Sequence, residues 1–320
     1  MAPPQIKTVL VVGASGIVGT QAIKHLLASN FQVSALIRSS STSTPSFPSE
    51  VRIFKTDYTP TSLRPAFANQ DAVLSTISGE GLALQRTLVD AAIAAGVKVF
   101  FPSEFGIDTT HPDAATLIPF LKPKIETLEY LETKQDRIAW TSIVSGSLCD
   151  WSLDIPSFGG IDVPGRKATI YDDGDVKYDA TTSEQVGRAI AAVMKQPLDV
   201  IANQHVYVNS FTVTQKEVLA ALEHATGEKF AISYDTVENL RKVGKEKLAG
   251  GNFYGMLELI ASSFYGRFGV ADFSIRKGLW NERLGLRGEQ LEGVVREYVK
   301  RKEVSGWRVV IPGSGDGDVK

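Results

Sequence analysis

The sequence predicts an α/β fold: a doubly wound parallel sheet, followed by a smaller α+β domain. Three observations predict it. Short apolar runs alternate with helical patterns through the first half, the first apolar run enters a glycine-rich turn directly, and the alternation loosens after about residue 150. Alternation of this kind is typical of parallel sheets with helices on both faces, and the turn indicates the Rossmann variant.

Each element of the first half follows from its local pattern. The apolar runs predict strands at 8–13, 32–38, 51–57, 71–78, 97–106 and 140–146. Helices are expected between them, at 16–30, 62–70 and 83–96, with one more from about 118 to before 137. The strands look apolar throughout rather than alternating, which is expected when both faces of a sheet are covered.

The second half mixes turns, helices and isolated strands. We expect hairpin-like pieces at 158–175, strands at 205–210 and 230–235, and helices at 183–196, 214–227, 236–248, 251–264 and 286–302. The predicted division is a cofactor domain at 1–150, with returns near 180–210, a substrate-binding part that is mainly 151–312, and a disordered tail at 313–320.

Composition excludes several classes of protein. A formal charge of −2 gives no basic excess for nucleic acid, and a single cysteine fits a reducing cytosol. No signal peptide or membrane-length apolar stretch is visible, and the 4 histidines show no metal-ligand spacing. We therefore expect a cytoplasmic monomer or homodimer that binds a small molecule and neither nucleic acid, membrane nor metal.

The turn GASGIVG, residues 13–19, indicates a dinucleotide site. Gly13 permits the tight turn, Gly16 lets the backbone approach a pyrophosphate, and Gly19 lets the helix pack closely on the sheet. The amide groups that open the helix would then bind the phosphates, so Ser15, Ile17 and Val18 belong to the predicted site. A glycine-rich turn without a ligand is the alternative.

The end of the second strand favours NADP over NAD. Arg38 and Ser39 stand where a carboxylate would bind the ribose 2′-hydroxyl of NAD, and no acid follows before Glu50. A guanidinium can donate two hydrogen bonds to one phosphate, although Arg38 could instead be a solvated surface residue. Asp57 would accept from the adenine amino group or cap its loop. The segment 76–78, which is Thr76, Ile77 and Ser78, would flank the nicotinamide ribose.

The segment FLKPKIETLEYLETK, residues 120–134, offers two candidate lysines. Because ligands bind at the carboxyl ends of the strands, the start of this helix should lie near the cofactor. Lys122 is at that start, whereas Tyr130 and Lys134 follow later, Lys134 roughly 18 Å further along the helix. We predict that Lys122, partly desolvated and with a lowered pKa, relays the proton. Lys124 should face elsewhere and be dispensable, and a plain surface lysine at position 122 is the alternative.

These motifs together resemble the isoflavone reductase and phenylcoumaran benzylic ether reductase group, in the NmrA-like branch of atypical short-chain dehydrogenases. The resemblance rests on GASGIVG, Arg38, FFPSEFG at 100–106 and the K-x-x-x-E of Lys122–Glu126, and it covers about residues 6 to 302. It implies NADPH, a Rossmann domain with a smaller substrate domain, a catalytic lysine matching Lys122, and cofactor contacts from Ser103, Glu104 and Phe105.

The sequence departs from the plant members of the group in two places. Pro123 follows Lys122, and SGSLCDWSL replaces their S-N-C-F pattern after the sixth strand, so the substrate pocket should differ. Trp151 and Phe158 are candidate pocket aromatics, or core residues. The function predicted is an NADPH-dependent reductase of a small aromatic or polyketide-like secondary metabolite. The rival hypothesis is an NADP-binding redox sensor without turnover.

Overall fold

A computed structural model describes residues 5–41, 46–155 and 158–306. Its centre is a seven-stranded sheet in the order β11-β6-β5-β4-β1-β2-β3, with every neighbouring pair parallel. The predicted doubly wound α/β fold is therefore confirmed. The strands are β1 (Thr8–Val12), β2 (Gln32–Arg38), β3 (Arg52–Thr56), β4 (Ala72–Ser75), β5 (Val99–Phe101), β6 (Ala139–Val144) and β11 (Gln204–Tyr207).

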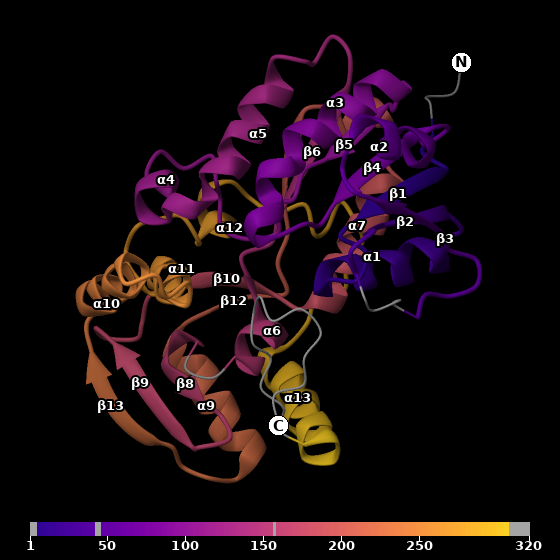
Figure 1. The fold of residues 1–320 in the computed structure, drawn as a ribbon. Coiled ribbons are helices and arrows are strands. Elements are labelled where there is room, and N and C mark those ends of the chain that lie inside the picture. The colour runs from indigo at the N-terminus through magenta and orange to yellow at the C-terminus, as the bar shows by residue number, and fades with distance from the viewer. Residues whose placement is uncertain (1–4, 42–45, 156–157, 307–320) are drawn as a thin grey trace.

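Helices cover both faces of this sheet (Figure 1). One layer holds α1 (Ile17–Ala28) and α7 (Ser183–Met194), which pack on each other. The other holds α2 (Pro60–Phe67), α3 (Gln85–Ala95) and α5 (Lys122–Glu132). Successive residues of a strand point to opposite faces, so Val9 and Val11 join the first layer's core while Leu10 and Val12 join the second's. This two-sided burial explains the continuous apolar run.

The outer strand β3 departs from the expected pattern. Arg52 and Lys55 are exposed, and Ile53 is 40% exposed. The expectation of uniformly apolar strands is wrong here, because β3 lies at the edge of the sheet and is paired on one side only. Exposed basic side chains also discourage another chain from pairing with such an edge.

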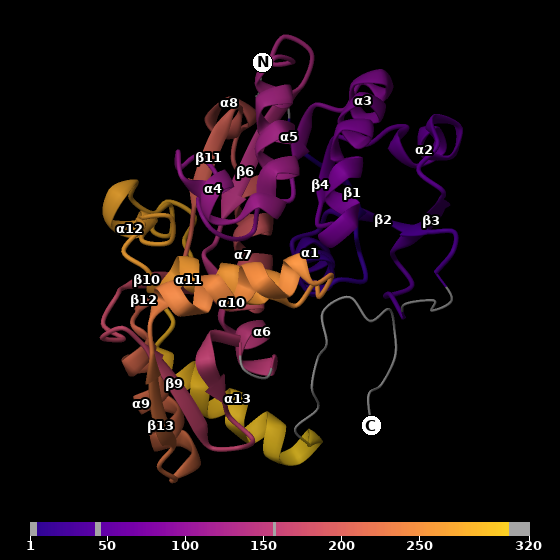
Figure 2. The same cartoon turned by 60° about the vertical axis from the view of Figure 1, so that its left-hand side comes forward.

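The later part of the chain builds two small sheets with a core of their own. Their orders are β12-β10-β7 and β13-β9-β8. The strands are β7 (Ser147–Leu148), β8 (Ile161–Asp162), β9 (Lys167–Tyr171), β10 (Tyr178–Thr181), β12 (Phe211–Val213) and β13 (Ala231–Asp235). The expected hairpin is the antiparallel pair β8 and β9. Figure 2 shows α10 (Val237–Ala249) and α11 (Gly255–Tyr265) crossing the molecule between the large sheet and the strands β9 and β13.

The remaining helices complete this part of the structure. They are α4 (Ala114–Leu117), α6 (Cys149–Asp154), α8 (Leu198–Ile201), α9 (Gln215–Thr226), α12 (Phe273–Arg276) and α13 (Leu291–Ser305), with short 3₁₀ turns at Gly79–Leu84, Pro119–Leu121 and Phe158–Gly160. Although α7 and β11 come from residues after 180, β11 belongs to the seven-stranded sheet and α7 packs with α1 on one of its faces. The division at residue 150 stays a prediction, and the tail predicted at 313–320 lies outside the described residues. None of the described helices could cross a membrane.

Candidate active site

Hydrogen bonds connect the segments that follow three neighbouring strands, β1, β4 and β5, at the carboxyl-end edge of the large sheet. Val12, the last residue of β1, lies opposite Ser75, the last residue of β4, so the segments after them start level. The Thr76 hydroxyl donates to the carbonyl of Gly13 at 3.0 Å. The Ser103 hydroxyl, after β5, donates to the carbonyl of Ile77 at 2.7 Å. The glycine turn and the segments after β4 and β5 are therefore joined to one another by hydrogen bonds.

The start of α5 adjoins the same edge. The ammonium of Lys124, in the first turn of α5, donates to the backbone carbonyl of Glu104 at 2.6 Å. The far end of the helix turns to α3, where the Tyr130 hydroxyl donates to Asp90 at 2.5 Å. Lys134 lies beyond the end of α5 with its ammonium 5.1 Å from the centre of the Tyr130 ring. The Tyr/Lys pair is thus engaged at the end of α5 that lies away from the glycine turn.

The glycine turn leaves the start of α1 uncapped. Gly16 is the N-cap of α1, with no side-chain hydrogen bond to the helix and no acid in its first turn. Four other helices have a threonine cap on their first turns, namely Thr59, Thr182, Thr214 and Thr236. Ser15 and Ile17 are exposed beside Gly16, while Val18 is buried. Free amide groups and the helix dipole at an open N-terminus suit an anion such as a pyrophosphate.

The three glycines of the turn differ in the space around them. Gly13 has a φ of 81°, and a Cβ there would lie 2.9 Å from the Thr76 backbone. A Cβ at Gly19 would lie 2.4 Å from the Gly13 carbonyl oxygen. At Gly16, by contrast, the nearest atom outside the flanking residues would be that same oxygen at 3.3 Å. Gly13 and Gly19 allow close packing, and Gly16 has its open side toward the outside, where a phosphate could approach.

Strand β2 ends in a cation, Arg38. Arg38 is exposed, and within residues 5–41, 46–155 and 158–306 it forms no ion pair. Ser39 is exposed beside it. This pairing of a free guanidinium with a hydroxyl is what a ribose 2′-phosphate would require.

The turn after β3 shows a role for Asp57 and a residue that the sequence did not single out. Asp57 accepts from the Thr59 amide at 3.0 Å and from its hydroxyl at 2.7 Å, so the loop-capping alternative is observed. Hydrogen bonds from Ser62 and Thr59 lower the pKa of Asp57 to about 2. Tyr58 is half-buried with a φ of 65°, and it is close enough to Arg38 for the guanidinium to affect its pKa, which burial raises. No sequence signal marks a tyrosine with a left-handed backbone.

Lys122 differs from expectation. It is the first residue of α5, but its side chain is 71% exposed, with its ammonium 3.5 Å from a carboxylate oxygen of Glu126. The predicted desolvation of Lys122 is therefore wrong for this structure, because the side chain points outward from the first turn. The desolvated amine is that of Lys124, whose pKa is lowered by burial. Another contact missed from the sequence is Gln85, fully buried, whose side-chain oxygen accepts from the Ser103 amide at 2.7 Å.

The two predicted pocket aromatics lie together. Trp151 and Phe158 have ring centres 5.5 Å apart at 59°. Phe158 is buried in the core of the second part, and Trp151 packs against that core while remaining half-buried. The core-packing alternative therefore holds for Phe158, and substrate contact by Trp151 stays a prediction.

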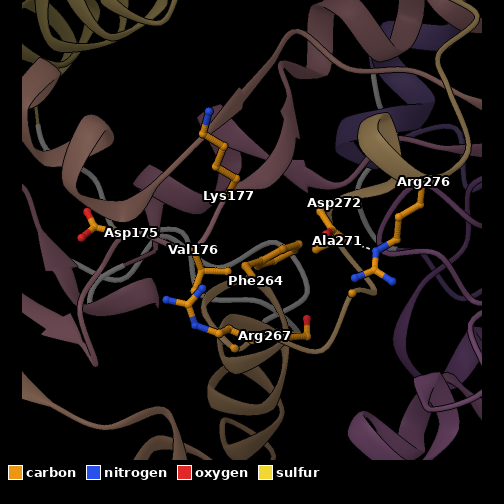
Figure 3. Close-up of a pocket in the computed structure, with 11 residues that line it drawn as sticks. Asp175, Val176, Lys177, Phe264, Arg267, Ala271, Asp272 and Arg276 are labelled. Carbon is orange, nitrogen blue, oxygen red and sulfur yellow. Dashed lines mark hydrogen bonds and ion pairs between the residues drawn. The ribbon is translucent and has the colours of Figure 1, made fainter.

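A separate hollow of about 410 Å³ lies between the segment before β10 and the end of α11 (Figure 3). Two of its three cations already have acid partners: Arg276 donates to Asp272 at 2.9 Å, and Arg267 to Asp173 at 2.7 Å. The third cation is Lys177. In the part of the chain that the structure describes, no group of three histidine, cysteine or acidic side chains could hold a metal. The edge with the glycine turn remains the candidate site.

Two fungal proteins are similar over most of the chain. Oxidoreductase aprR of Aspergillus flavus is 32% identical over 297 residues, which span 91% of this chain and 98% of that protein. Oxidoreductase poxI of Penicillium oxalicum is 30% identical over 255 residues, 79% of this chain and 80% of that one.

Solved structures and a family model agree with these relatives. Leucoanthocyanidin reductase from Vitis vinifera, in a binary complex with NADPH, has a TM-score of 0.76 and 21% identity over 92% of this chain and 99% of its own. A crystal structure of isoflavone reductase has a TM-score of 0.72 at 21% identity over 92% of this chain and 100% of its own. At such identity these structures show the fold alone. The model of the NmrA-like family matches residues 5–272. The chain therefore belongs to the NmrA-like family, as an oxidoreductase of its isoflavone reductase-like branch.

Proposed function

We propose that the protein is an NADPH-dependent reductase of a small aromatic or polyketide-like metabolite. The observation that carries this proposal is the arrangement at the carboxyl ends of the strands: an uncapped start of α1, an Arg38 that forms no ion pair among the described residues, and the lysine-bearing start of α5. Each of the three would serve a different part of the same dinucleotide.

The residues present fit NADPH. The amides that follow Gly16 would bind the pyrophosphate, and Arg38 with Ser39 would bind the 2′-phosphate. Asp57 and Tyr58 would border the adenine. Toward the nicotinamide, the proposed contacts are the two segments Thr76–Ser78 and Ser103–Phe105. Bound NADPH would supply a hydride from its nicotinamide ring.

Lys122 would hold the nicotinamide ribose and deliver the proton that accompanies reduction. Its exposed ammonium at the start of α5 can rotate away from Glu126, 3.5 Å distant, toward a ribose hydroxyl or the substrate oxygen. An amine in open water is a weak catalyst. A substrate that covers the site would exclude water from Lys122 and ease transfer of its proton. We place the substrate between this lysine and Trp151.

The test is single-turnover oxidation of NADPH, followed by fluorescence, with a panel of phenolic ketones, enones and benzylic ethers. We expect at least one class to react. With that substrate, Lys122→Met should lower the rate about 10²–10⁴-fold, the usual contribution of a positioned general acid. Lys242 provides the matched control, because its side chain is 70% exposed and it lies 4.0 Å from Glu246 four residues later. Equal rates for the two variants would exclude Lys122 as the proton donor.

A second candidate is a redox sensor that binds NADP(H) without turnover. The observation in its favour is the solvent exposure of Lys122, since a sensor needs no desolvated proton donor. Tight binding of NADPH with no oxidation against the whole panel would favour the sensor. Turnover of any substrate would exclude it. The oligomeric state, monomer or homodimer, and the cytoplasmic location stay predictions.

A further inference from the structure

Strand β13 forms one edge of the sheet β13-β9-β8 and lies at the outer margin of the molecule (Figure 1). Its side chains Ile232 and Tyr234 are 47% and 74% exposed. They lie on the same face as their neighbours in β9, Ala168 and Ile170, which are buried in the core of the second part. The apolar face of this sheet therefore continues beyond its covered part.

The outer side of β13 also offers backbone groups to a further strand. On the inner side, the Ala231 amide donates to the Arg166 carbonyl at 2.8 Å, so Ala231 directs its backbone groups toward β9. Neighbouring residues of a strand direct these groups to opposite sides. Those of Ile232 and Tyr234 therefore point away from β9, to a side where β13 pairs with no other described strand. Such a row of donors and acceptors is a template for strand pairing.

The two edge strands of five residues, β3 and β13, differ in how they are protected. β3 carries the exposed basic side chains of Arg52 and Lys55, which discourage pairing. β13, with the sequence AISYD, has no basic residue and no proline, and its one charge is Asp235 at its end. The edge of β13 is thus open to pairing in a way that the edge of β3 is not.

The charges beside β13 fit a second copy of the same strand. Lys229 lies just before β13, and Asp235 ends it. When two copies pair antiparallel about a twofold axis, with Ile232 opposite Ile232, the Lys229 of each copy lies opposite the Asp235 of the other. In the alternative pairing, with Ile232 opposite Tyr234, Lys229 lies opposite Val237 instead. Charge complementarity therefore favours one occupant of this edge and one register.

Both charged groups can join such a contact without losing their present partners. The Lys229 ammonium lies 2.6 Å from Glu223, and the lysine side chain is 88% exposed. The Asp235 carboxylate accepts from the Thr236 amide at 2.7 Å and from the Asn239 side chain at 2.9 Å. An ammonium has further N–H donors, and a carboxylate accepts several hydrogen bonds at once.

We propose that the outer edge of β13 is the interface of a homodimer. Two copies pair antiparallel through β13, centred on Ile232, so that the sheet β13-β9-β8 of one copy continues into that of the other. The contact covers Ile232 and Tyr234 and pairs Lys229 with Asp235 at both ends. This inference concerns the protein without its cofactor and does not rest on the proposed function.

The first test is sedimentation velocity across a dilution series, in which the wild type should pass from dimer to monomer. Ile232→Lys should weaken association at least about tenfold, because it places two lysines opposite each other at the centre of the pair. Ile53→Lys is the matched control: Ile53 is 40% exposed and belongs to the other five-residue edge strand, β3. It should associate as the wild type does.

Two results would overturn the inference. One is an Ile232→Lys protein that dimerises like the wild type. The other is a wild type that stays monomeric throughout, which would leave the edge to an extended segment of a different protein.

A charge swap tests the register. Lys229→Asp alone or Asp235→Lys alone places like charges opposite each other, so each variant should associate more weakly than the wild type. Mixed in equal amounts, the two variants should form dimers again, because every contact then joins opposite charges. A folding defect in either variant cannot produce this recovery. A mixture that associates no better than its components would refute the proposed pairing.

Hydrogen exchange on the wild type needs no substitution. In concentrated protein, peptides covering 230–236 should exchange more slowly than in dilute protein, because the outward amides of Ile232 and Tyr234 become paired. Peptides covering 52–56, in β3, should exchange equally in both. Equal exchange of 230–236 at concentrations where dimers form would place the interface elsewhere and overturn the inference.

Discussion

Substituting two glycines of the same turn should separate cofactor binding from folding. At Gly16 a valine Cβ would meet only the Gly13 carbonyl oxygen at 3.3 Å, and the backbone, with φ of −73° and ψ of 169°, suits a β-branched residue. Replacing glycine by valine at an N-cap costs on the order of 1 kcal/mol. The Gly16→Val protein should therefore fold, with its new side chain where the pyrophosphate would lie.

The expected loss of binding follows from the hydrogen bonds removed. Each bond from a backbone amide to a charged phosphate contributes about 1.5–3 kcal/mol, so losing two weakens binding by at least about a hundredfold. Gly19→Val should behave in the opposite way. Its Cβ would lie 2.4 Å from the Gly13 oxygen and 2.9 Å from Ala14 backbone atoms, which cannot move aside cheaply. Overpacking of this kind costs about 1–3 kcal/mol or more.

Calorimetric titration with NADPH and thermal unfolding measure the two effects. Gly16→Val should unfold near the wild-type temperature and fail to bind. Gly19→Val should unfold at a clearly lower temperature. If Gly16→Val bound NADPH with wild-type affinity, the phosphates would have to lie elsewhere and the assignment of this turn would be refuted.

Four further predictions follow from the site and its surroundings. Arg38→Ala should weaken NADPH binding about ten- to a hundredfold more than NADH binding, because only NADPH carries the 2′-phosphate; equal losses in parallel titrations would contradict this. Lys134→Ala and Tyr130→Phe should leave single-turnover rates unchanged, and a loss in either would restore the Tyr/Lys pair as a candidate. Burial raises the pKa of the Cys149 thiol to about 12, so iodoacetamide at pH 8 should label it only after unfolding. The pKa of Asp57 is lowered to about 2 from 3.8, so its ionised carboxylate stabilises the fold above pH 4, and this stabilisation is lost as the pH falls toward 2. Asp57→Asn should therefore lower the unfolding temperature at pH 6, and the difference from the wild type should shrink in acid. A difference that does not change with pH would exclude the carboxylate as the cause.

The sequence by itself determined the architecture of the large sheet and the strand ends at which the candidate site lies. Strands covered on both faces must be apolar at successive positions, and TVLVV in β1 shows this directly. The glycine turn could also be predicted from the sequence, because the close packing at Gly13 and Gly19 leaves no room for a side chain. These are local constraints, and they leave a mark in the local sequence.

Only the tertiary structure decided what each lysine of α5 contacts. Lys122 and Lys124 are two positions apart, and sequence spacing says that they face different ways without saying which way is inward. The buried partner of Lys124 is the Glu104 carbonyl, 20 residues earlier, and a backbone carbonyl carries no sequence signal. The left-handed backbone of Tyr58 was hidden for a related reason, whereas loop capping by Asp57 was one of the two roles expected from the sequence. A side chain's surroundings depend on how distant elements pack, and that packing is determined by the whole fold rather than by the neighbouring residues.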